Sequence, residues 1–204
     1  MTPSLTIREG QFLVTLARTA ISEYLLSHTK LDPPMNTPRS LFEKAGVFIT
    51  LHSVAPAQKL RGCIGSLLPT EPLAVATIQS AIDAATADER FYPLDLAEFK
   101  SSVVIELSVL TLPERLLSEA PAERLSEIRI GKDGLMVEHG IHRGILLPQV
   151  APEQNWTAEE FLNHCCIKAG LPAEAWLDKR TRVERFQATI FEEKTPDGEV
   201  HLKE

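Results

Sequence analysis

A chain of 204 residues with 44% hydrophobic and 24% charged residues has the composition of a soluble globular protein. Its net charge of -7 argues against a basic nucleic-acid-binding surface, so no nucleic-acid partner is predicted. The sequence lacks a run of about eighteen apolar residues that would predict a membrane span, and the N-terminus lacks a signal-peptide pattern. The odd number of cysteines argues against a disulfide framework, and we expect a cytoplasmic protein with reduced thiols.

The first predicted element is an amphipathic helix that begins after Thr6. Thr6 and Glu9 have the spacing of a capping box, in which each residue's side chain accepts the other's backbone amide. Apolar side chains then recur at helical intervals. The prolines of residues 30–40 predict a loop after this helix.

Residues 47–52 and 60–64 alternate apolar and mixed side chains and predict an antiparallel hairpin centred near Ala55 and Pro56. In this register Thr50 faces Arg61, and Phe48 faces Cys63. Strand geometry divides the hairpin into two faces. The expected core face holds Val47, Ile49, Leu51, Leu60 and Ile64. The mixed face holds Phe48, Thr50, His52, Arg61 and Cys63.

A second helix is expected after Thr70, which is predicted as its N-cap, and the clearest strand is expected at Val103–Leu110. Glu106 lies in the middle of that strand among apolar residues. Because an unpaired buried charge is costly, the carboxylate needs a partner, and we predict Arg61.

The second half of the chain predicts short strands and a helix. Asp133-Gly134 is a hairpin-turn signal, and His139-Gly140 is a weaker one. Thr157 and Glu160 form a second capping box, and residues 186–191 alternate as a last strand. Helices interleaved with hairpin-linked strands predict an α+β fold, with a mainly antiparallel sheet flanked by helices.

Cys63 is the main candidate for chemistry. A thiol near a guanidinium ionises more readily and becomes nucleophilic, and Gly62 and Gly65 would let a ligand approach closely. The alternative is a small buried hydrophobic residue. Arg61 with Glu106 is interpreted either as an anion clamp beside an acid–base group or as a structural ion pair.

The adjacent residues His164, Cys165 and Cys166 lack zinc-ligand spacing, and no nucleotide-binding fingerprint is present. We therefore predict neither a metal nor a cofactor.

The segment Leu60-Arg-Gly-Cys-Ile-Gly-Ser66 resembles the AMMECR family, and the similarity extends from about Thr6 to Glu192. Further matching segments are Ala87-Asp-Glu-Arg-Phe91, Ser108-Val-Leu-Thr111, Gly131-Lys-Asp-Gly-Leu135, Leu146-Leu-Pro-Gln-Val-Ala151 and Cys166-Ile-Lys-Ala-Gly-Leu-Pro172. The resemblance implies a single α+β domain over residues 1–204, made of two subdomains with a cleft. The larger subdomain would hold the N-terminal helix, the central sheet and the C-terminal strand.

The resemblance assigns no reaction. Prokaryotic members resemble component A of the AmmeMemoRadiSam system, which implies a Memo-like protein and a radical S-adenosylmethionine protein as partners. Two hypotheses follow, and in the first an enzyme or enzyme component uses Cys63 and Glu106 on a small anionic or carbonyl substrate. Its substrate-binding residues would be Arg61, Gly62, Gly65, Ser66, Ser108 and Gln149. The second hypothesis is a non-catalytic protein that binds the partner components.

Overall fold

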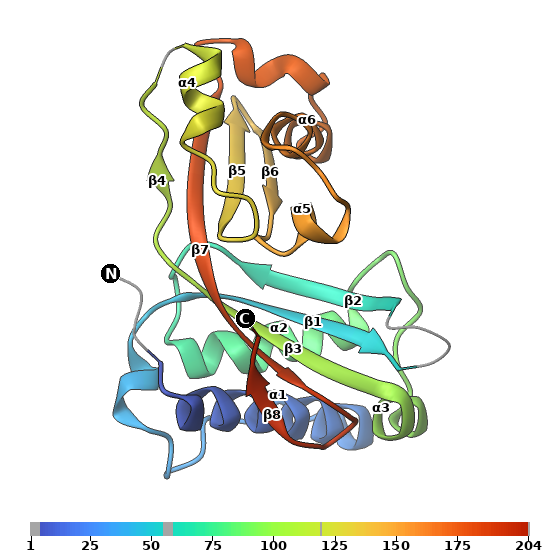
Figure 1. Cartoon of the computed structure of the whole chain (residues 1–204). Coiled ribbons are helices and arrows are strands. Elements are labelled where there is room, and N and C mark those ends of the chain that lie inside the picture. Colours follow the sequence, from blue (N-terminus) through green and yellow to red (C-terminus); the bar gives the residue numbers. More distant parts are fainter. Residues whose placement is uncertain (1–4, 55–58, 119, 204) are drawn as a thin grey trace. The chain divides into compact units, whose positions relative to one another are not determined.

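The computed structural model describes residues 5–54, 59–118 and 120–203, and it divides into two compact units (Figure 1). Unit 1 comprises Met1–Leu112 and Thr189–Glu204, and unit 2 comprises Pro113–Ala188. The strands pair antiparallel and are flanked by helices, which confirms the predicted α+β class. Within the described ranges, no helix is long and apolar enough to cross a bilayer.

Two helices cover one face of the sheet in unit 1, α1 (Ile7–Ser27) and α2 (Leu73–Thr86) (Figure 1). The predicted capping box begins α1, because the Thr6 side chain accepts from the Glu9 amide and the Glu9 carboxylate accepts from Thr6. The predicted N-cap at Thr70 is wrong. The Leu73 amide that begins α2 instead donates to the carbonyl oxygen of Glu43, at 2.9 Å.

The sheet of unit 1 has the strand order β2-β1-β3, followed by the C-terminal part of β7 and then β8. Its strands are β1 (Gly46–Ser53), β2 (Lys59–Ser66), β3 (Val103–Leu110), β7 (Arg182–Glu193) and β8 (Val200–Leu202). The predicted bounds of β3 are confirmed, and its apolar face is 0% exposed at Val103, Ile105, Leu107 and Val109. Short helices at Arg39–Phe42 (η1) and Leu96–Ser102 (α3) complete the unit.

The predicted hairpin is confirmed, but its register is wrong. Thr50 lies opposite Cys63 rather than Arg61, and Phe48 lies opposite Gly65. The register shifts by one residue between Leu51 and His52, because Arg61 is the extra residue of a β-bulge. The predicted centre of the hairpin, at residues 55–58, lies outside the described residues.

The faces predicted for the hairpin are confirmed in part. Val47, Ile49 and Leu51 are buried in the core, as predicted. Leu60, predicted to join them, is 40% exposed beyond the bulge, so that prediction is wrong. Cys63 lies opposite Thr50 instead of the predicted Phe48, which is a shift of two residues. Because a shift of two keeps a strand residue on the same face, Cys63 stays on the mixed face.

Unit 2 is a smaller layer of strands against helix α6 (Ala158–Lys168), with the N-terminal part of β7 between β4 and β5. The predicted second capping box, formed by Thr157 and Glu160, begins α6. The other elements are β4 (Glu114–Arg115), α4 (Pro121–Ser126), β5 (Asp133–His139), β6 (His142–Leu146), α5 (Val150–Glu153) and η2 (Ala173–Leu177).

The stronger turn signal of this unit is wrong, whereas the weaker one is confirmed. Asp133 and Gly134 begin β5, where buried Asp133 accepts hydrogen bonds from Arg129. A Cβ atom at Gly134 would lie 2.5 Å from the Phe186 ring, so this glycine allows close packing. The turn lies at Gly140, which has a φ of 61°.

Candidate functional site around Cys63

Cys63 lies on the face of β2 that points away from α2. Its neighbour Gly62 presses against the helix, since a Cβ atom there would lie 2.1 Å from the carbonyl oxygen of Ala84. Because successive strand residues alternate between faces, Cys63 projects to the opposite side. Its side chain is half-buried. Gly62 therefore has a packing role beside the candidate thiol, and its predicted role in substrate binding stays a prediction.

The thiol of Cys63 accepts a hydrogen bond from the Thr50 hydroxyl on β1, with an Oγ1–Sγ distance of 3.4 Å. Thr50 in turn lies opposite Glu106 on β3. A row of three side chains, Cys63–Thr50–Glu106, thus crosses three strands on one face of the sheet. A hydroxyl that donates to sulfur favours the thiolate over the thiol.

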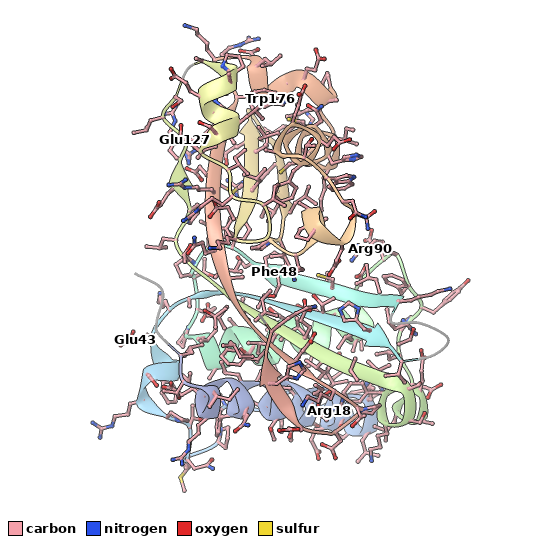
Figure 2. The ribbon with its side chains drawn as sticks, in the orientation of Figure 1. Arg18, Glu43, Phe48, Arg90, Glu127 and Trp176 are labelled. Carbon is pink, nitrogen blue, oxygen red and sulfur yellow. The ribbon has the colours of Figure 1, made fainter. Side chains whose placement is uncertain are left out.

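A second row runs beside the first. It comprises Gly65, Phe48 and Ser108, at matching positions of β2, β1 and β3 (Figure 2 labels Phe48). Ser108 is 0% exposed, and its hydroxyl has no hydrogen-bond partner within the described part of the chain. The two rows bring four predicted site residues onto one face of the sheet, where Glu106 and Ser108 are buried: Cys63, Gly65, Glu106 and Ser108.

The backbone of Cys63 is held by the loop that follows α2. Its amide donates to Asp88 Oδ2 at 2.8 Å, and its carbonyl oxygen accepts from Arg90 Nη2 at 3.3 Å (Figure 2 labels Arg90). Asp88 and Arg90 also pair with each other, at 2.6 Å. The two side chains thereby satisfy the N–H and C=O groups of Cys63 that point away from β1, as a neighbouring strand would.

Asp88 and Arg90, which together form a clamp on the Cys63 backbone, stabilise each other's charge. The hydrogen bond from Arg90 lowers the pKa of Asp88 to about 2. Burial acts in the opposite direction, and the hydrogen bond from the Cys63 amide adds to the lowering. The hydrogen bond to Asp88 raises the pKa of Arg90. The clamp is therefore fully ionised at neutral pH and fixes Cys63 in place.

The predicted pairing of Arg61 with Glu106 is wrong. Glu106 is 2% exposed and pairs with Lys203, which follows β8, at 2.7 Å. Lys203 also contacts Glu192, at 3.2 Å. Burial lowers the pKa of Lys203, but the hydrogen bond and charge of Glu106 outweigh it, so the net shift is upward. The C-terminal segment thus supplies the cation beside Glu106.

Arg61 points elsewhere because it is the bulged residue, and bulges redirect side chains. Its guanidinium binds both carboxylate oxygens of Glu98 on α3, at 2.7 and 3.1 Å, and donates to the carbonyl oxygen of Tyr92 at 2.9 Å. Arg61 and Arg90 both lie over the Phe91 ring, at 6.0 and 5.5 Å from its centroid.

An open pocket of about 640 Å³ lies beside the Phe91 ring. It is lined by Arg61, Glu89, Arg90, Phe91 and Tyr92. The volume suits a small molecule. Each guanidinium already carries a carboxylate partner, so an anionic ligand would share donors rather than meet a bare cation. The carbonyl of Cys63 contacts Arg90 in this wall, whereas its sulfur points toward Thr50.

Two further predicted site residues are Ser66 and Gln149. Ser66 is exposed opposite Val47, and its hydroxyl donates to the carbonyl oxygen of Leu68. Gln149 belongs to unit 2, so its membership of the site stays a prediction. Among the described residues, no group of three or more His, Cys, Asp or Glu side chains could hold a metal ion.

The other two cysteines lie in the core of unit 2. Cys165 and Cys166 are both 0% exposed. Burial raises the pKa of Cys165 to about 12 and also raises that of Cys166. Cys63, which is half-buried, is the most accessible of the three cysteines.

Sequence reasoning missed Asp88, Arg90 and Lys203 as parts of this site. Asp88 and Arg90 lie within a segment that matches the family. Two opposite charges directly after a helix were the only local indication that these residues belong to the site. Nothing local shows that such a loop meets a strand edge. Lys203 is 97 residues from Glu106, and the sequence carries no signal of that pairing.

The fold and the cysteine-centred site define an α+β protein of two units, and comparison with known proteins gives its family. The AMMECR1 family model matches residues 14–191, and the chain belongs to that family. It is 53% identical to Protein PYRAB00100 of Pyrococcus abyssi over 196 residues, covering 95% of each chain. It is 47% identical to Protein MJ0810 of Methanocaldococcus jannaschii, covering 96% of each.

A solved structure has the same fold. The crystal structure of uncharacterized protein PH0010 from Pyrococcus horikoshii matches with a TM-score of 0.93 and 49% identity. The match covers 96% of this chain and 97% of that one.

Proposed function

We propose that the protein is an enzyme, or a component of one, that uses the Cys63 thiol as a nucleophile. The observation that carries this proposal is the hydrogen bond from Thr50 to the Cys63 sulfur, made on a strand whose backbone is clamped by Asp88 and Arg90. A nucleophile needs an ionisable, accessible and fixed thiol. Cys63 has a hydroxyl donor, partial exposure and a held backbone.

The substrate that suits this site is small and carries an electrophilic carbonyl carbon beside an anionic group. Attack by sulfur forms one S–C bond, moves the carbonyl π electrons onto oxygen and releases the thiol proton to water. Arg61, Arg90 and Phe91 line the neighbouring pocket, so the proposal requires the anionic group to reach this pocket while the carbonyl carbon lies at the Cys63 sulfur. The buried Glu106 carboxylate is the acid–base candidate of the same row.

Selective labelling tests the proposal. Iodoacetamide at neutral pH, followed by peptide mass spectrometry, is expected to modify Cys63 well before Cys165 and Cys166. Cys63→Ser should abolish this fast modification while the thermal unfolding curve stays unchanged. Modification of all three cysteines at one slow rate, or only after unfolding, would remove Cys63 as the nucleophile.

A second candidate is a non-catalytic protein whose surface binds a Memo-like protein and a radical S-adenosylmethionine protein. It is favoured by Tyr92, which is 90% exposed beside Arg61, because exposed Tyr and Arg side chains are typical of interface centres. Pull-down of the two partner proteins distinguishes the candidates. Loss of capture with Tyr92→Ala but not with Cys63→Ser favours binding alone, whereas Cys63-dependent turnover favours the enzyme.

A further inference from the structure

A second pocket lies entirely within unit 2, and the proposed thiol chemistry does not use it. It has a volume of about 250 Å³. Its walls are formed by Arg115, Leu116, Leu117, Arg124, Lys179, Thr181 and Val183. Three of these side chains carry positive charge in a protein whose net charge is -7.

The arginines of unit 2 divide into two groups. Five of the seven form ion pairs with carboxylates: Arg129, Arg143, Arg180, Arg182 and Arg185. Within the part of the chain that the structure describes, Arg115 and Arg124 form none, and both line this pocket. Arg124 is partly buried and Arg115 is exposed. A partly buried cation without a counter-ion is unfavourable, so the Arg124 guanidinium favours an anion in this pocket.

Arg124 is fixed in the pocket wall by neutral partners. Its Nε donates to the carbonyl oxygen of Ser118 at 3.0 Å, and its Nη1 donates to that of Trp176 (Figure 2 labels Trp176). These bonds orient the guanidinium without neutralising its charge. A donor that is held in place before binding loses little entropy when a ligand arrives.

Two carboxylates of the described part of unit 2, Glu184 and Glu127, have partners other than Arg115 and Arg124. Glu184 lies opposite Arg115 in the β4–β7 pairing, but it pairs with Arg182 at 2.9 Å. Glu127 accepts from the Ser118 amide at 3.3 Å. Within the described ranges, neither of these two carboxylates forms an ion pair with Arg115 or Arg124.

We propose that this pocket binds the phosphoryl group of a small ligand. Two guanidinium groups from separate segments suit a dianion with several acceptor oxygens, whereas one carboxylate is satisfied by a single guanidinium. The apolar walls of Leu116 and Val183 leave room for an attached organic part. The site is independent of Cys63.

Isothermal titration calorimetry of the full chain with pyrophosphate at low salt tests this site. We expect one site per chain, weakened by salt and weakened about tenfold by Arg115→Gln, which removes a charged donor. Arg115 makes no side-chain bond within the described residues, so this change should leave the fold intact. Arg124→Lys keeps the positive charge but loses the planar guanidinium that is held in place by two carbonyl oxygens, so it should also weaken pyrophosphate binding.

Arg143→Gln is the matched control, because Arg143 is a half-exposed arginine of the same unit that pairs with Glu138. It should leave pyrophosphate affinity unchanged. Four results would overturn the proposal: no binding of pyrophosphate, binding that both pocket variants leave unchanged, an equal loss in the Arg143 variant, or acetate binding as tightly as pyrophosphate.

Discussion

The Thr50 hydroxyl donates a hydrogen bond to the Cys63 sulfur, and this contact joins two strands that pair in a defined register. Thr50 and Cys63 lie opposite each other without sharing backbone hydrogen bonds. The N–H and C=O groups of Cys63 point away from Thr50, and they bind the side chains of Asp88 and Arg90. Side chains of such non-hydrogen-bonded pairs lie closest together. The register of the hairpin therefore places the donor at the thiol.

Replacement of Thr50 by Val keeps the shape of the side chain and removes the donor. We expect the alkylation rate of Cys63 at neutral pH to fall about fivefold, the equivalent of one hydrogen bond of about 1 kcal/mol. Thr50→Ser retains the hydroxyl and should keep most of the rate. A rate that is equal in the Val and Ser variants would show that the hydroxyl does not act on the sulfur.

Asp88→Asn tests the clamp through its pH dependence. The pKa of Asp88 falls from about 3.8 to about 2 on folding, chiefly through Arg90, so its charge stabilises the fold above pH 4 and this contribution disappears as the pH falls toward 2. At pH 7 the variant should lose about 1–2 kcal/mol of unfolding free energy, because Arg90 is half-exposed.

Urea denaturation of both proteins at pH 7 and again near pH 2.5 measures this difference. The gap between wild type and Asp88→Asn should shrink at the lower pH. A gap of the same size at both values would mean that the carboxylate charge contributes nothing.

Gly62→Ala should destabilise the protein by about 1–3 kcal/mol, because the new methyl group would overlap the Ala84 carbonyl and push β2 away from α2. Thermal unfolding measures the loss. Ser66→Ala, an exposed change on the same strand, serves as the control and should be almost neutral. Equal melting temperatures for both variants would refute the close approach.

Lys203→Met removes the cation beside the buried Glu106 carboxylate. We expect a loss of about 1–3 kcal/mol, smaller than for a fully buried pair because the lysine side chain is 31% exposed. Lys203→Arg should recover part of this stability. In a double-mutant cycle, adding Glu106→Gln to Lys203→Met should cost little more, whereas fully additive losses would show that the two residues are not coupled.

Periodicity and capping signals were sufficient to predict most elements. The strand Val103–Leu110 and both capping boxes could be found because each signal is local. The turn at Asp133-Gly134 failed for a tertiary reason, since Arg129 provides a partner for the buried Asp133 and the Phe186 ring requires a residue without a side chain at Gly134.

The candidate site was predictable only in part. Alternation along the strands placed Thr50, Cys63 and Glu106 on the mixed face. The bulge at Arg61 could not be foreseen, and it redirected the guanidinium to Glu98, leaving Glu106 to the distant Lys203. Long-range charge pairing depends on the assembled fold, which the order of residues does not reveal.

The rate of Cys63 alkylation as a function of pH shows directly whether the folded protein activates this thiol. The measurement uses the native protein and, as its reference, the same chain unfolded in urea, with modification at Cys63 followed by mass spectrometry. A hydroxyl donor at the sulfur and a clamped backbone predict that the native thiol reaches half its maximal rate at a lower pH than the unfolded thiol. A native profile that coincides with the unfolded one, or lies at higher pH, would contradict the role of Cys63 as an activated nucleophile.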